Sequence, residues 1–307
     1  MASSVPVSVL SAASGAPLYA RRLARPQSSG PSLPPPTSLD ELLAWAAKHD
    51  DPFAGRRNPG AAAACIIQVD DGLPLYLALT AADLAAAARA LASCWRLYGI
   101  RRGDYVLIYD YGTSPLTLFA SWCYVPALRR GAADLIGAVP VCNDGLPELA
   151  ARALHVLRYL RPRVMFVDRQ VMPAFVQQVS DQHAVLADWV GLVVVAVDEE
   201  LLPPEQLAAW TAGLGVPVRA VLRAGPALFF AAQCEGGAFH VDRRFYRVET
   251  VKEGAPRPSG SGAGNLCITN LFLRGTPAVR YQTGLSVLLV RGPCRCGRPG
   301  AVLRSPV

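Results

Sequence analysis

The feature that most constrains the fold is a repeated alternation of short apolar runs with amphipathic segments between residues 104 and 222. The runs have the length and composition of buried strands, and the segments between them show helical periodicity. Strands that are buried on both faces and joined through helices form mainly parallel sheets. The sequence therefore predicts an α/β domain, with strands at DYVLIYD, around LIGAVPV, and at RVMFVD, GLVVVAV and PVRAVL, and helices at 114–131, 146–160, 171–180 and 203–215.

The segment before this alternation carries two recognisable helix caps. SLDELLAWAAKHD has Ser38 at the N-cap and Glu41 at the capping-box position, which predicts an amphipathic helix. A strand is expected over 62–69. Thr80 and Asp83 form a second cap, which predicts the start of an alanine-rich helix.

The two ends of the chain differ from its middle. Residues 1–37 are rich in Ser, Ala and Pro and contain no acidic residue, which predicts a disordered tail. An organelle transit peptide has a similar composition, and the sequence leaves that alternative open. After about residue 226 the helical signals stop, and runs separated by turn residues predict strands. We therefore expect a tail at 1–37, an α/β subdomain at 38–225 and a β-rich subdomain at 226–307.

Composition argues against two classes of partner. The net charge is +7, but the arginines are scattered rather than gathered on a basic face, so nucleic-acid binding is not expected. We find no apolar run of about 18 residues, so no membrane span is expected. Most of the eight cysteines fall inside apolar runs, and no secretory segment precedes them. These features favour a reducing, cytoplasmic setting without disulfides.

The stretch RGPCRCGRPG places Cys294 and Cys296 one residue apart in a turn-like segment. A closed tetrahedral zinc site would need two more ligands, and QCEGGAFHVD offers Cys234 and His240 on either side of two glycines. The four would make a Cys3His set with no open position for water, which is a structural rather than a catalytic site. From the residues alone, four unrelated side chains remain the alternative, because the long-range pairing has no local sequence signal.

Several segments resemble phenylacetate–CoA ligases, which belong to the adenylate-forming (acyl-CoA synthetase) superfamily. GNLCITNLFLRGTPAVRYQTG followed by PCRCGR is similar to the end of their large domain, where many members carry C-x-C-G-R. QCEGGAFHVDRRFY is similar to a second segment of the family, YDYGTSPLTLF to the Y-G-Y-G segment of the acyl pocket, and KHDDPFAGRR to the N-terminal helix. The resemblance covers residues 38 to 300 and is most specific over 233–299.

The resemblance implies a fold, a metal and a pocket. It implies the large N-terminal domain of the adenylate-forming fold with a β-rich C-terminal part, and we expect the small C-terminal domain to be absent because the sequence stops at Val307. It also favours the Cys3His set as a structural zinc site. The implied acyl pocket, for which core packing is the alternative, would contain Tyr109, Tyr111 and Gly112, with Phe229 and Phe230 lining the same cavity.

The departures from the family concern nucleotide binding. Where the family has a glycine-rich phosphate loop with a nearby lysine, this chain has VDDGLPLYLALT, with one glycine, two aspartates and no lysine. Ala224 stands at the magnesium-binding acidic position, and Leu285 stands where the family has a ribose-binding aspartate. We therefore expect neither ATP nor Mg²⁺ as a cofactor.

These observations lead to one function and two alternatives. The chain is expected to be a degenerate, non-adenylating pseudoenzyme that binds an aromatic or acyl small molecule or a biosynthetic partner enzyme, with a homodimer as the family expectation. The alternatives are an enzyme that reuses the acyl pocket for ATP-independent acyl transfer or cyclisation, and a residual acyl-CoA ligase completed by a partner chain. No catalytic residue is assigned: Asp110 and Asp168 lie at strand edges, but the sequence gives neither an evident partner carboxylate.

Overall fold

The computed structural model describes residues 5–23, 33–70, 73–252 and 258–306, and the chain divides into two compact units. The first unit, the β-rich unit, comprises Met1–Ala87, Ala224–Phe229 and Val241–Val307. The second, the α/β unit, comprises Ala88–Arg223 and Phe230–His240. Asp71, one of the two aspartates in the VDDGLPLYLALT segment, lies outside the described residues.

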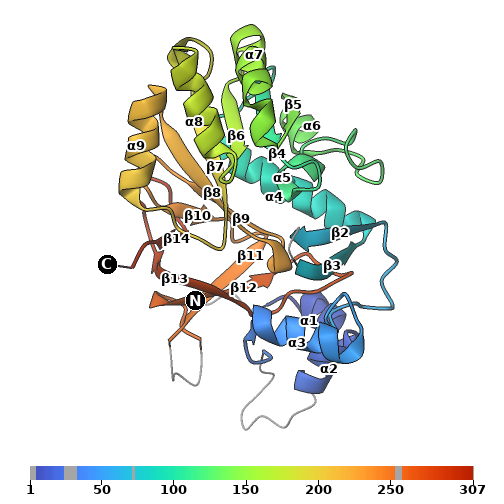
Figure 1. Cartoon of the computed structure of the whole chain (residues 1–307). Coiled ribbons are helices and arrows are strands. Elements are labelled where there is room, and N and C mark those ends of the chain that lie inside the picture. The colour runs from blue at the N-terminus through green and yellow to red at the C-terminus, as the bar shows by residue number, and fades with distance from the viewer. Residues whose placement is uncertain (1–4, 24–32, 71–72, 253–257, 307) are drawn as a thin grey trace. The chain divides into compact units, whose positions relative to one another are not determined.

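The α/β unit is built on the predicted, mainly parallel sheet (Figure 1). Its strands follow the order β10-β9-β8-β7-β6-β4-β5, in which β4 to β8 pair in parallel and β9 and β10 form an antiparallel hairpin. The core strands are almost wholly buried because Val, Ile and Leu occupy both of their faces. The strands are β4 (Tyr105–Asp110), β5 (Val139–Asp144), β6 (Val164–Asp168), β7 (Val193–Asp198), β8 (Val218–Ala224), β9 (Phe229–Gln233) and β10 (Phe239–Val241).

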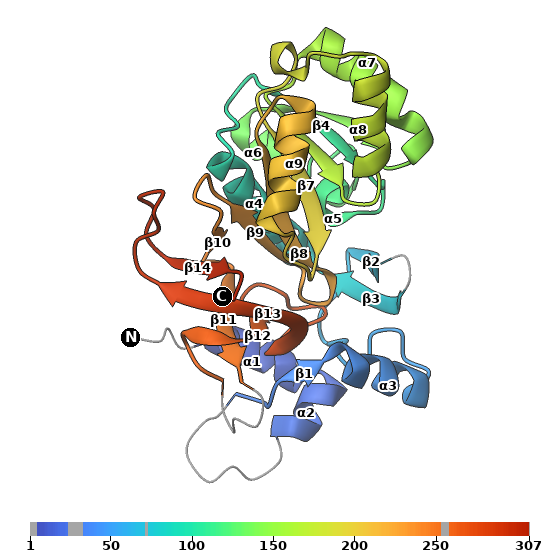
Figure 2. The same ribbon diagram turned by 60° about the vertical axis from the view of Figure 1, so that its left-hand side comes forward.

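Helices cover both faces of this sheet. In β4 and β6, Ile108 pairs with Phe166, so the next residue of β4, Tyr109, points to the opposite face. Phe166 packs against Trp95 near the end of α4, with ring centroids 5.4 Å apart, whereas Tyr109 contacts Phe175 of α8 at 6.3 Å. Figure 2 shows α4 and α8 on opposite sides of this sheet. The helices are α4 (Ala81–Leu97), α5 (Pro115–Leu118), α6 (Ala132–Ile136), α7 (Ala150–Leu160), α8 (Met172–Asp181) and α9 (Pro204–Leu214), with 3₁₀ turns at Pro147–Leu149 and Leu186–Asp188.

The β-rich unit contains an antiparallel sheet in the order β11-β12-β13-β14, with the short β1 added in parallel to β13. A separate hairpin is formed by β2 and β3. The predicted β-rich end is therefore confirmed, although the predicted strand over 238–251 is interrupted between β10 and β11 by a turn at Asp242. The strands are β1 (Thr37–Ser38), β2 (Cys65–Asp70), β3 (Leu73–Leu79), β11 (Tyr246–Val251), β12 (Gly262–Asn270), β13 (Tyr281–Arg291) and β14 (Ala301–Arg304), and a 3₁₀ turn spans Gly225–Ala227.

Residues 38–87 group with the C-terminal strands in the β-rich unit. The predicted cap of α4 is present: the Asp83 N–H donates to Thr80 Oγ1 at 3.1 Å, and the Asp83 carboxylate accepts from the Thr80 N–H at 2.9 Å. The same carboxylate also accepts hydrogen bonds from the backbone N–H groups of Arg274 and Gly275, at 2.9 and 3.0 Å. One cap therefore fixes a helix to a segment 191 residues away in the chain.

Part of the predicted tail is helical instead of disordered. Helices α1 (Val7–Ser14) and α2 (Pro17–Leu23) form a small apolar cluster that includes Val9 and Tyr19. The Tyr19 ring is 1% exposed, and its hydroxyl accepts a hydrogen bond from the Val279 N–H at 3.0 Å. Composition predicted disorder because it contains no information on the spacing of apolar side chains. In α1 and α2 a few apolar residues are spaced so that one helix face is buried. Residues 1–4 and 24–32 lie outside the described part.

Helix α3 (Leu39–His49) has the predicted reciprocal capping box between Ser38 and Glu41. The predicted helix at 114–131 is wrong beyond Leu118. Pro126 cannot continue a helix, and the backbone instead closes a loop in which Ala132 N–H donates to Phe119 O at 2.8 Å. No helix in the described residues is long and apolar enough to span a membrane.

Candidate metal centre and the carboxyl edge of the sheet

The turn between β9 and β10 presents Cys234. The Cys234 carbonyl accepts a hydrogen bond from Gly237 N–H at 3.0 Å, and the Cys234 N–H donates to Ala238 O at 2.9 Å. Gly237 has φ +74°, a conformation that glycine adopts without steric cost. The turn therefore closes tightly, and His240 follows on β10, where it pairs with Ala232 of β9.

The turn between β13 and β14 repeats this geometry with Cys294. Its carbonyl accepts from Gly297 N–H at 2.8 Å, its N–H donates to Arg298 O at 2.9 Å, and Gly297 has φ +81°. Both turns thus place a cysteine three residues before a left-handed glycine. The second turn adds Cys296 at the position that Gly236 holds in the first.

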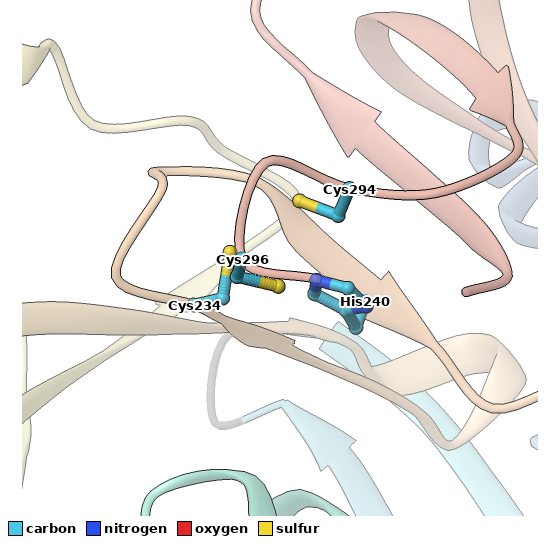
Figure 3. Close-up of side chains that lie close together, drawn as sticks. All are labelled: Cys234, His240, Cys294 and Cys296. Atoms are coloured by element: carbon cyan, nitrogen blue, oxygen red, sulfur yellow. The ribbon is translucent and has the colours of Figure 1, made fainter. Parts of the chain in front are cut away.

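The four predicted ligands lie together, as Figure 3 shows. The three Sγ atoms and one imidazole nitrogen all lie within 4.8 Å of one another. Tetrahedral ligands at Zn–S distances of about 2.3 Å are separated by about 3.7 Å, so a modest contraction would close the shell. Cys234 and Cys294 are buried. Three thiols and one imidazole form a donor set that fits a soft or borderline cation, so this cluster could hold a metal ion.

A second polar cluster, which sequence reasoning missed, lies at the carboxyl edge of the parallel sheet. The strands β4, β6 and β7 end in Asp110, Asp168 and Asp198, and all three carboxylates contact the guanidinium of Arg223 on β8. Nη1 of Arg223 lies 2.7 Å from Asp110 Oδ2, Nη2 lies 3.0 Å from Asp168 Oδ2, and Nε lies 2.9 Å from Asp198 Oδ1. A signal was present in the sequence, because four successive strands, β4 to β7, each end in aspartate.

This Arg223 cluster sets one buried guanidinium against three carboxylates. The side chains of Arg223, Asp110 and Asp168 are 6%, 1% and 6% exposed, whereas that of Asp198 is 51% exposed. Burial raises the pKa of Asp110, with Arg223 acting in the opposite direction. Burial lowers and the aspartates raise the pKa of Arg223, with a net upward shift. The arginine therefore stays charged, and the cluster carries its own cation.

The predicted acyl-pocket residues lie at the same edge of β4, but in different environments. Tyr109 is fully buried, and its hydroxyl donates to Leu146 O at 2.6 Å. Burial, with the nearby carboxylate of Glu148, raises the pKa of Tyr109 to about 12. Tyr111 is only partly buried, with its hydroxyl 3.4 Å from Gln170 Oε1, and Gly112 is exposed. Tyr111 and Gly112 thus remain accessible to a ligand, whereas Tyr109 is part of the core.

The two phenylalanines predicted to line the pocket are both core residues by burial. Phe229 and Phe230 are each 1% exposed. Phe229 packs edge-to-face on Tyr246, with the ring centroids 4.8 Å apart. Neither ring reaches the surface, so a role in ligand binding would require an internal cavity beside it.

The segments predicted to have lost nucleotide contacts form regular structure. Strand β2 ends at Asp70 and β3 begins at Leu73, so two residues separate the strands of the hairpin. The N–H groups of Tyr76 and Ala78 donate to Pro52 O and Thr276 Oγ1, both at 2.9 Å. Ala224 ends β8 and is 1% exposed.

Comparison with known proteins gives a structural likeness without a sequence match. No protein-family model and no curated protein matches the chain. A 2-hydroxyisobutyryl-CoA ligase, crystallised with 2-HIB-AMP and CoA, superposes with a TM-score of 0.77 at 17% identity, over 96% of this chain and 70% of that one. A second structure of that ligase is covered to 65%, so this chain spans about two thirds of its length.

Two further solved structures agree at lower similarity. The anthranilate CoA ligase AuaEII, bound to anthranoyl-AMP, has a TM-score of 0.52 and 16% identity over 77% of this chain and 45% of its own. The o-succinylbenzoate CoA synthetase of Bacillus subtilis has a TM-score of 0.53 and 12% identity over 80% and 50%. At these identities the likeness shows the fold: the chain has the architecture of adenylate-forming acyl-CoA ligases, as the sequence predicted.

Proposed function

We propose that this chain uses the fold of adenylate-forming acyl-CoA ligases, in a form related to phenylacetate–CoA ligases, without activating acids with ATP. It would bind an aromatic or acyl small molecule, or a biosynthetic partner enzyme, as a pseudoenzyme. The observation that carries this proposal is the short connection of the β2–β3 hairpin. Two residues lie between Asp70 and Leu73, in the segment that resembles the phosphate-binding region of the family.

A phosphate loop requires several consecutive backbone N–H groups that are free to turn toward the anion. In this hairpin, Ile66 pairs with Ala78 and Gln68 pairs with Tyr76 in antiparallel register, and the register shifts between Gln68 and Asp70. The N–H groups of Tyr76 and Ala78 are bonded to other parts of the β-rich unit. The described strand residues therefore have few free donors for a triphosphate.

The position expected to bind magnesium also supports the proposal. Ala224 offers no oxygen ligand from its side chain, whereas Mg²⁺ requires oxygen donors. The preceding residue is Arg223, whose guanidinium is held by three carboxylates. Those carboxylates are already hydrogen-bonded to the arginine, which competes with any use of them as replacement oxygen ligands for Mg²⁺.

We further propose that the Cys3His cluster holds structural zinc. Cys234, Cys294, Cys296 and His240 would complete a four-ligand shell, leaving no site for a catalytic water. Such a metal would contribute to folding by holding two turns that are distant in sequence.

The test combines pyrophosphate exchange with ligand binding. ATP–pyrophosphate exchange is measured with a panel of aromatic and short-chain acids, and thermal shifts are measured with the same acids in the absence of ATP. We expect no exchange and a saturable thermal shift with at least one acid. Acid-dependent pyrophosphate exchange would contradict the proposal.

A pair of tyrosine variants locates the binding. Tyr111→Ala should reduce the ligand-induced shift, because this partly buried ring lies at the carboxyl edge of the sheet. Tyr105→Ala, at the other end of β4 and 42% exposed, is the matched control and should retain the shift. Equal shifts in both variants would argue against a pocket at Tyr111.

A further inference from the structure

A cavity of about 500 Å³ lies in the β-rich unit, and none of the residues discussed above as metal ligands or pocket residues lines it. Helix α2, the segment before β1 and helix α3 form its walls. Its lining combines apolar surface with several charged groups. The lining residues are Leu18, Arg21, Arg22, Pro35, Pro36, Glu41, Ala44, Trp45, Lys48 and His49.

The Trp45 indole forms the aromatic part of the wall of this α2–α3 cavity, and the backbone at Gly55 packs against it. A methyl group at Gly55 would come within 2.5 Å of the indole ring, so the backbone packs directly against it. Gly55 has φ +69°, and its carbonyl accepts a hydrogen bond from Leu18 N–H at 2.8 Å. The His49 ring lies 4.4 Å from the Trp45 ring on the other turn of the helix. The apolar wall is therefore preformed.

Two of the charged groups in the cavity neutralise each other. Arg22 donates to Glu41 Oε1 at 3.0 Å, to Thr37 Oγ1 at 2.8 Å and to Pro36 O at 3.0 Å. The other carboxylate oxygen of Glu41 accepts from Ser38 N–H in the capping box. Glu41 thus has its charge compensated and its oxygens occupied, which limits its repulsion of an incoming anion.

Two further cationic side chains of the cavity, Arg21 and Lys48, remain for binding an anionic ligand. The Arg21 guanidinium lies over the Trp45 ring, with its Cζ 4.8 Å from the ring centroid. Lys48 lies in the last turn of α3, one turn beyond Ala44. Within the described part of the chain, neither Arg21 nor Lys48 forms an ion pair. The cavity therefore presents net positive charge beside an aromatic wall.

We propose that the α2–α3 cavity binds a small organic anion with a flat apolar body and one carboxylate or phosphate group. Arg21 and Lys48 would bind the anionic group, and Trp45 with Leu18 and the two prolines would contact the apolar part. Five of the ten lining residues are apolar and five are ionisable, a mixture that suits a ligand with an apolar body and an anionic group. This site uses none of the residues of the proposed acyl pocket, so it stands independently of the proposed function.

The test uses isothermal titration calorimetry with phenyl phosphate and benzoate as probes, and with inorganic phosphate and benzyl alcohol as the single-feature controls. We expect saturable binding of both probes, with the two controls binding at least about tenfold more weakly because each lacks one half of the ligand. Arg21→Gln and Lys48→Gln should each weaken binding about fivefold or more, since each removes a charge-assisted hydrogen bond.

The matched control is Arg152→Gln, which removes an exposed arginine from α7 of the other unit and should bind as the wild type does. Lys48 is exposed, so Lys48→Gln tests the site without a risk to folding, and circular dichroism confirms the fold of each variant. The proposal is overturned if the wild type binds neither probe saturably, or if both glutamine variants bind them with wild-type affinity.

Discussion

The two polar clusters of this protein differ in where their cation comes from. The Arg223 cluster brings three strand-terminal carboxylates onto a guanidinium that the chain itself supplies. The Cys3His cluster brings three thiols and an imidazole within 4.8 Å of one another, a set of donors suited to a cation from solution. One cluster is complete as folded, and we propose that the other is completed by a bound metal ion.

This difference has a consequence for the carboxyl edge of the sheet, where open α/β folds bind ligands. In this chain the edge is occupied by side chains that satisfy one another. A buried guanidinium bonded to three carboxylates is costly to rearrange, because moving it would leave buried charges without partners. At this edge Arg223 and its three carboxylates are therefore fixed by one another, whereas Tyr111 and Gly112 stay at least partly exposed.

The largest effect is expected from breaking the Cys3His cluster, which we propose to hold structural zinc. Cys294→Ser should abolish stoichiometric zinc binding and lower the free energy of unfolding by at least about 4 kcal/mol, a fraction of the apparent binding energy of structural zinc sites. Chemical denaturation with parallel metal analysis measures both. Cys65→Ser, which alters a partly exposed cysteine of β2, should change neither. A Cys294→Ser protein with wild-type stability would contradict this role for the cluster.

The next largest effect concerns the internal cation. Arg223→Met leaves the buried carboxylates of Asp110 and Asp168 facing each other without a counter-charge, so we expect a loss of about 3–5 kcal/mol in unfolding free energy. Arg169→Gln is the control, because it breaks an exposed ion pair with Glu200 and should cost less than about 1 kcal/mol. Similar losses in the two variants would show that burial of the Arg223 cluster does not determine how much unfolding free energy is lost.

A smaller, pH-dependent effect follows from Asp110. Its pKa is raised in the folded protein, so between the unfolded and folded pKa values the folded state binds more protons. The stability of the wild type should therefore rise relative to that of Asp110→Asn as the pH falls through this window, above the ordinary aspartate pKa. Paired urea titrations from pH 7 to pH 4 measure the difference. A wild type that loses stability relative to the variant over this range would show that the pKa is lowered instead.

The smallest effect separates the members of the Arg223 cluster by burial. Asp198→Asn, at a side chain that is half exposed, should alter stability by less than about 1 kcal/mol, because solvent screens its contact with Arg223. Asp168→Asn, at a side chain that is 6% exposed, should change stability more. Thermal unfolding of the two variants gives the order, and the reverse order would mean that exposure does not govern these contacts.

Much of the fold could be predicted from local sequence signals. The capping residues Ser38 and Glu41 marked the start of α3, and Thr80 with Asp83 marked the start of α4. The apolar runs that became β4, β6, β7 and β8 were predicted within a few residues, because strands buried on both faces have a distinctive composition. The four metal ligands were proposed together, and the structure gathers them.

What the sequence did not predict depends on contacts between distant residues. The hydrogen bonds that the Asp83 carboxylate accepts from the N–H groups of Arg274 and Gly275 have no signature in the local sequence. The aspartates that end β4, β6 and β7 were visible, but their convergence on Arg223 requires the order of the strands in the sheet. The strand β3 was not predicted, because its residues directly follow turn-forming residues in the sequence. Its extended structure depends on its pairing with β2.

The distinction between the two clusters can be tested most directly by native mass spectrometry and elemental analysis of the wild-type protein, purified without added metal. We predict one zinc ion per chain, its loss in Cys294→Ser, and its retention in Arg223→Met if that variant folds. A folded wild-type chain that carries no metal would contradict the account.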